Sequence, residues 1–139
     1  MTEPVSYIQM LIFALVGVGV AIALLFYIRK YDVPRKKRFL TIGLFVASAI
    51  YVLFALTTMN LFWIAMESAG LLLFVLFIWM ARHYSLWFVV LGWALHTVWD
   101  VGVVYETAPY VPFWYAWICV GFDLLVAAYL AVILIRHDH

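Results

Sequence analysis

The chain has few charged residues and a single cysteine in its 139 residues. Lys, Arg, Asp and Glu make up only 11% of it, whereas hydrophobic residues make up 70%. This composition lies far outside that of a soluble domain and predicts an integral membrane protein. The formal net charge of +1 gives no reason to expect a nucleic-acid partner. Cys119 cannot form a disulfide within the chain, and its apolar setting predicts an inert, packed thiol.

Long polar stretches are also missing, because apolar runs follow one another closely. A membrane-spanning helix needs about 20 apolar residues to cross about 30 Å of hydrocarbon. The runs that approach this length are 7–28, 39–56, 61–80, 86–104 and 113–135. No connection between them exceeds about ten residues, which leaves no room for a soluble domain. We therefore predict an all-α bundle of five membrane-spanning helices that forms one domain over residues 1–139.

Lys and Arg are absent from one side of this pattern. Six of the eight lie between the first two runs, Arg82 lies between the third and fourth, and Arg136 follows the fifth. By the positive-inside rule, this distribution predicts an amino terminus outside and a carboxyl terminus in the cytoplasm. Membrane lipids are the expected neighbours of the spans and of the basic residues.

Small residues recur at four-residue spacing within two of the spans. Gly17 pairs with Ala21 in the first span, and Gly43 pairs with Ala47 in the second. Such pairs let helices approach closely in a membrane. The spacing is compatible both with contacts inside one chain and with a homo- or hetero-oligomer.

Four ionisable residues lie inside the predicted spans: Glu67, His96, Asp100 and Asp123. Each costs about 3 kcal/mol or more in a membrane unless it is paired or faces water. His96 and Asp100 are four residues apart, so they share one helix face. Glu67 and Asp100 are predicted in the outer half of the membrane, and His96 and Asp123 lie close to its midplane. We expect the four to converge on one polar pocket that opens outward.

The residue types alone do not determine the chemistry of this predicted site. A histidine and three carboxylates fit a metal site, a proton relay, or a catalytic acid and base. The spacing lacks a recognised metal signature. No haem is expected, because His96 is the only histidine within a span. The simplest alternative is that the four groups satisfy one another as polar contacts between helices, each worth about 1 kcal/mol.

The run Gly92-Trp-Ala-Leu-His-Thr-Val-Trp-Asp100 and the later Gly-Phe-Asp at 121–123 carry a family resemblance. With Glu67 after Trp63, they resemble an uncharacterised family, a domain of unknown function, of small bacterial integral membrane proteins with a GW-x-LHT-x-WD motif. The resemblance covers roughly the last eighty residues and implies the plasma membrane of a bacterium. It implies that Glu67, His96, Asp100 and Asp123 form one site, and it brings no activity or cofactor.

Aromatic side chains near this motif are candidate ligand-binding residues. Trp93 and Trp99 lie three residues before and after His96, so each flanks the histidine face of the helix. Their indole rings could stabilise a cationic intermediate of an apolar lipid, although plain packing also accounts for them. Trp63, near the outer end of the third span, and Tyr105, in the outer loop after the fourth span, complete the candidate set.

Three classes of function follow from these patterns. An enzyme that acts on a lipid-soluble molecule predicts a hydrophobic cavity beside His96, large enough for an acyl or isoprenoid chain. A metal-binding or proton-relay protein predicts a narrow, wet cavity. A non-catalytic accessory subunit or assembly factor predicts an exposed face of small residues and no cavity.

Overall fold

The computed structural model describes residues 7–105 and 110–137, and these residues are almost entirely helical, with no strand among them. The helices are α1 (Tyr7–Ile28), α2 (Val33–Leu56), α3 (Leu61–His83), α4 (Trp87–Trp99), the π-helix η1 (Asp100–Tyr105) and α5 (Phe113–His137). The predicted all-α class is therefore confirmed.

Four of these helices, α1, α2, α3 and α5, are each long and apolar enough to cross a membrane. α4 alone has 13 residues, and η1 continues it without a break to Tyr105. The wider turns of a π-helix are uncommon and often mark functional positions. Here the π-helix begins at Asp100, one of the four ionisable residues. The molecule is thus a multi-pass helical bundle of the membrane-embedded kind.

The start of α2 differs from the sequence-based expectation. The helix begins at Val33 rather than at residue 39, because Asp32 caps it by accepting a hydrogen bond from the Arg35 backbone N–H at 3.3 Å. Pro34 follows in the first turn, where its missing N–H costs nothing. The basic residues 35–38 therefore lie in the first turns of α2 rather than in a loop.

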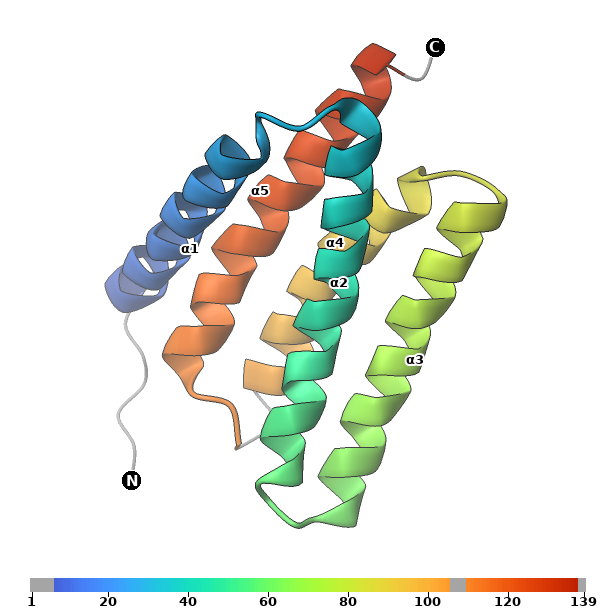
Figure 1. Cartoon of the computed structure of the whole chain (residues 1–139). Helices are drawn as coiled ribbons and strands as arrows, with labels where there is room; N and C mark the ends of the chain where they lie inside the picture. Colours follow the sequence, from blue (N-terminus) through green and yellow to red (C-terminus); the bar gives the residue numbers. More distant parts are fainter. Residues whose placement is uncertain (1–6, 106–109, 138–139) are drawn as a thin grey trace.

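Successive helices run antiparallel (Figure 1). The α1–α2 connection, the α3–α4 connection and the end of α5 lie at one end of the bundle, and the start of α1 and the α2–α3 connection lie at the other. All eight Lys and Arg residues fall at or beside the first group of segments. We call this the basic end.

α1 makes its most extensive contact with α5, although the two are the farthest apart in sequence. A Cβ at Gly17 would collide with the backbone carbonyl of Ile118, and one at Gly121 would collide with that of Ala14. Ala21 is fully buried one turn after Gly17. The small residues of α1 therefore serve a helix contact within the chain.

Six polar or charged side chains are buried among the described residues: Ser48, Glu67, His96, Thr97, Asp100 and Asp123. Two of them are satisfied by their own helices. Ser48 donates to the carbonyl of Leu44 at 2.9 Å, and Thr97 donates to that of Trp93 at 3.3 Å. The other four are the ionisable residues singled out from the sequence.

Candidate functional site

Three of the four ionisable residues meet in the interior. His96 comes from α4, Asp100 begins η1, and Asp123 comes from the middle of α5. The Nδ1 atom of His96 lies 2.8 Å from Oδ2 of Asp123 and 3.4 Å from Oδ1 of Asp100. None of the three is more than 1% exposed. We call these residues the His–Asp cluster.

Tyr51, from α2, completes the surroundings of the cluster. Its hydroxyl donates to Oδ1 of Asp100, and its ring stacks on the His96 imidazole with centroids 5.4 Å apart and planes 14° apart. The Phe74 ring also contacts the imidazole, at 5.0 Å between centroids. Sequence reasoning did not identify Tyr51, because one tyrosine among nine in an aromatic-rich chain gives no distinguishing signal.

The hydrogen bonds of the cluster favour a proton on Nδ1 of His96, because that atom faces two carboxylate oxygens. Nε2 of His96 and Oδ2 of Asp100 are buried without a hydrogen-bond partner among the described residues. Buried polar atoms normally have partners, so unpaired ones call for an explanation. The cluster therefore keeps the capacity to donate or accept a proton, or to bind a ligand atom.

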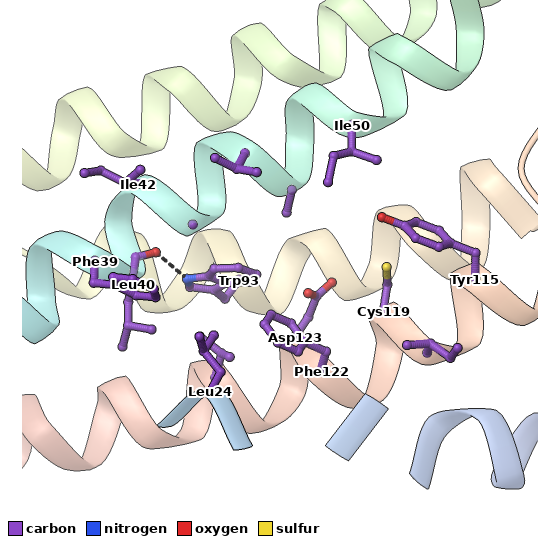
Figure 2. A pocket seen from close by; sticks show the side chains of 15 residues that line it. Leu24, Phe39, Leu40, Ile42, Ile50, Trp93, Tyr115, Cys119, Phe122 and Asp123 are labelled. Atoms are coloured by element: carbon purple, nitrogen blue, oxygen red, sulfur yellow. Dashed lines mark hydrogen bonds between the residues drawn. The ribbon is translucent and has the colours of Figure 1, made fainter. Parts of the chain in front are cut away.

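An apolar cleft of about 530 Å³ lies beside the cluster (Figure 2). Its walls come from α1, α2, α4 and α5, and Figure 2 shows α2 on one side and α5 on the other. Among the described residues that line it, Asp123 is the one that carries a charge. The same carboxylate that contacts His96 is thus part of the cleft wall.

The cleft reaches the outer surface of the bundle along α2. Phe39, Ile42 and Val46 line it and are each more than a third exposed, on a helix apolar enough to lie in a membrane. An apolar molecule could therefore enter from the side, out of the hydrocarbon. Trp93 forms part of the inner wall, where its indole N–H donates to the Leu40 carbonyl at 3.0 Å (Figure 2).

Glu67 has different partners. Its Oε1 accepts a hydrogen bond from the Trp99 indole N–H at 3.0 Å, and its Oε2 accepts one from the Tyr110 hydroxyl. Burial, followed by the hydrogen bond to Glu67, raises the pKa of Tyr110 above its ordinary value of 10.0, so this phenol stays a donor. We call Glu67, Trp99 and Tyr110 the Glu67 cluster.

The aromatic residues predicted to bind a ligand are divided between the cleft and the Glu67 cluster. Trp93 lines the cleft. Trp99 contacts Glu67, and the Trp63 ring packs edge-on against the Tyr110 ring with centroids 5.5 Å apart. Tyr105 ends η1, but its side chain lies outside the described residues. The structure thus brings His96, Asp100 and Asp123 together and gives Glu67 a separate set of bonds.

The His–Asp cluster also has the donors of a metal site. His96, Asp100 and Asp123 each offer one ligand atom, and these atoms all lie within 4.8 Å of one another. One imidazole nitrogen with two carboxylate oxygens suits a divalent cation such as zinc or manganese. A metal at this point would take the place of the shared proton.

Comparisons of the chain with protein-family models, with curated proteins and with solved structures find no match. The resemblance to an uncharacterised bacterial membrane family, based on residues 92–100 and 121–123, therefore stays a prediction. Function is inferred from the chemistry of the cluster and the cleft.

Proposed function

We propose that the chain binds an apolar, lipid-like molecule in the cleft and carries out acid/base chemistry on it with the His–Asp cluster. One observation supports this most directly: Asp123 contacts His96 at 2.8 Å and at the same time lines the apolar cleft. A carboxylate–imidazole pair that borders an apolar binding space can exchange protons with a molecule held there.

The size and walls of the cleft favour such a ligand. Small-molecule sites typically measure about 300 to 1,000 Å³ and are mostly apolar with a few placed polar groups. The cleft, at about 530 Å³ with Asp123 as its charged residue, falls in this class. Its lateral opening at Phe39, Ile42 and Val46 would admit a molecule already dissolved in the bilayer.

An allylic proton shift, which moves a carbon–carbon double bond along the lipid chain, is the reaction class that needs no co-reactant. One carbon of a carbon–carbon double bond gains a proton, and the carbon bonded to the other end of that double bond loses one. The double bond moves and the molecular formula is unchanged, so no oxidant is needed. Asp123, which lines the cleft, would exchange these protons with the lipid, and His96 would pass protons to and from Asp123. Tyr51 would hold Asp100 and the imidazole in place.

Solvent deuterium tests this proposal without knowledge of the substrate. Purified protein is reconstituted with the total lipid extract of the native cells and incubated in D₂O. After back-exchange into H₂O, carbon-bound deuterium is measured by mass spectrometry. With the wild-type protein, one lipid species is expected to gain carbon-bound deuterium. Val46→Trp, which obstructs the cleft mouth, is expected to lower labelling at least tenfold.

The control is Val20→Trp, on the surface of α1 away from the cleft lining. Val20 and Val46 are both about half exposed, so the two changes disturb the lipid-facing surface equally. Two results from these variants would contradict a reaction in the cleft. Either Val46→Trp keeps the wild-type level of labelling, or both variants abolish labelling. The absence of any carbon-bound deuterium with folded wild-type protein would also contradict it.

A metal-binding or proton-relay site is the second candidate, favoured by the three converging ligand atoms. Elemental analysis by mass spectrometry, after purification without chelators, separates it from the first. About one equivalent of a transition metal in wild type, lost in His96→Ala, would support it. No metal in either protein would leave acid/base chemistry as the better account.

The same proposal includes five membrane spans in a bacterial plasma membrane, with the amino terminus outside. α4 and η1 together run from Trp87 to Tyr105, close to the length that about 30 Å of hydrocarbon requires. The basic end would then face the cytoplasm.

Single cysteines at Thr58 and Ser85, in a Cys119→Ser background, test this orientation with a membrane-impermeant maleimide. Intact cells should label Thr58→Cys and not Ser85→Cys, and the reverse pattern would overturn the orientation.

A further inference from the structure

A second groove starts at the basic end and lies between α2 and α3. It measures about 560 Å³. Lys37 and Arg38 line it from the first turns of α2, and Arg82 lines it from the last turn of α3. Cations from two helices, remote in sequence, thus border one hollow. We call this the basic groove.

Below these cations the groove is apolar. Ile42 and Phe45 continue it along α2, and Val75 and Ile78 continue it along α3. From Lys37 to Phe45 is two helical turns, about 12 Å at 1.5 Å per residue. The groove therefore changes from cationic to apolar along its length, over a distance that suits part of an acyl chain.

The charge of the groove is of one sign. No carboxylate is found among the described residues that line it. The nearest acidic residue in sequence, Asp32, caps α2 and pairs with Arg35 at 3.8 Å, and neither of them lines the groove. Basic pockets between membrane helices at the headgroup level bind anionic lipids, whereas cations that serve only as topological anchors need no shared apolar hollow beneath them.

We propose that the basic groove binds one anionic phospholipid. Its phosphate would lie among Lys37, Arg38 and Arg82, and one acyl chain would lie along the apolar part of the groove. This ligand differs from that of the cleft, whose lining has a carboxylate and no cation in the part of the chain that the structure describes. The two hollows share Ile42 in their walls, but none of the residues of the His–Asp cluster lines the basic groove.

The test is native mass spectrometry of the detergent-purified full chain titrated with dioleoyl phosphatidylglycerol. Dioleoyl phosphatidylcholine, which has the same chains and no net charge, is the matched lipid. Wild type is expected to bind one phosphatidylglycerol at least tenfold more tightly than phosphatidylcholine. The double variant Arg38→Gln with Arg82→Gln is expected to lose that preference.

The matched control is Arg29→Gln with Arg136→Gln, which removes two arginines from the same end but none from the groove. It should bind phosphatidylglycerol like wild type. Ile78→Trp, which fills the apolar part and changes no charge, should also weaken binding at least tenfold. If the double variant does not fold, Arg38→Gln alone should reduce the preference severalfold.

Three results would overturn the proposal. If the two double arginine variants lose phosphatidylglycerol binding equally, the overall positive charge of this end, not the groove, attracts the lipid. Equal binding of the two lipids by wild type would exclude recognition of the phosphate charge. Unaltered binding by Ile78→Trp, or equally tight binding of the chain-free headgroup glycerophosphoglycerol, would mean that no acyl chain occupies the groove.

Discussion

Glu67 and Asp123 are carboxylates with the same burial, each 1% exposed, yet their surroundings differ. Both oxygens of Glu67 accept hydrogen bonds from neutral donors, one on Trp99 and one on Tyr110. Asp123 instead contacts a titratable imidazole and forms part of the wall of an apolar cleft. The Glu67 cluster is a closed set of bonds, whereas the His–Asp cluster includes unpaired buried atoms.

The difference separates two uses of a buried charge in a membrane bundle. A carboxylate whose bonding capacity is taken up by neighbouring helices contributes to stability. A carboxylate beside a proton-carrying group and a binding space has the means for chemistry. Variants of the two clusters should therefore separate stability from activity.

The largest effect is expected for His96→Ala on activity. Carbon-bound deuterium labelling of the lipid extract should fall by about 100-fold or more, because general acid/base groups contribute about 10²- to 10⁴-fold. The fold should persist, as judged by circular dichroism and detergent gel filtration. A folded variant with wild-type labelling, or one that does not accumulate, would remove the distinction between the clusters.

Glu67→Ala should show the opposite pattern. It leaves the Trp99 indole N–H and the Tyr110 hydroxyl without an acceptor, which should cost about 2 kcal/mol of unfolding free energy. Unfolding by sodium dodecyl sulfate in mixed micelles measures this loss. Glu67→Gln keeps one acceptor oxygen and should lose less. Labelling per folded molecule should stay at the wild-type level in both, and a specific loss of labelling would place Glu67 in the chemistry.

Tyr51→Phe should have an intermediate effect that falls on the His–Asp cluster. The change removes the hydroxyl that donates to Asp100 and keeps the ring that stacks on His96. About 1 kcal/mol of stability should be lost, and labelling should drop by about tenfold if positioning costs 1.4 kcal/mol. The rate should fall at saturating lipid with little change in half-saturation. A change in half-saturation alone would make Tyr51 a binding residue.

The smallest effect is expected for Tyr110→Phe, and it should depend on pH. Because the pKa of Tyr110 is raised in the folded protein, unfolding releases its proton once the pH passes 10.0. Its contribution to stability is therefore complete below pH 10 and falls as the pH rises further. The difference in unfolding midpoint between wild type and Tyr110→Phe should narrow above pH 10. A gap that is constant with pH would contradict the Glu67 hydrogen bond.

Much of the fold follows from the sequence because length and composition determine where apolar helices form. The runs at 61–80 and 113–135 match helices that begin at the expected residues, Leu61 and Phe113. The early start of α2 arises from a local cap at Asp32. A hydropathy pattern does not detect that cap, because it starts a span only after the charged residues 35–38 have ended.

The candidate site was predictable only in part, since apolar helices give no clear indication of which face points inward. The four-residue spacing places His96 beside Asp100, and the structure agrees at 3.4 Å. The separate bonding of Glu67 depends on the rotation of α3, which a uniformly apolar span does not encode. The cleft lies between α2 and α5, and no residue pattern in the sequence specifies how these two helices are placed.

The contact between α1 and α5 has a consequence for biosynthesis. α1 finds its main partner, across Gly17 and Gly121, only after α5 has been synthesised, because α5 follows the other described helices in the sequence. Until then the surface of α1 around Gly17 and Ala21, which α5 covers in the complete bundle, stays exposed. A truncated chain could insert its early helices and still lack the final closure. A chain truncated before α5 is therefore expected to keep the α1 surface around Gly17 exposed, and such exposed surface favours misassembly.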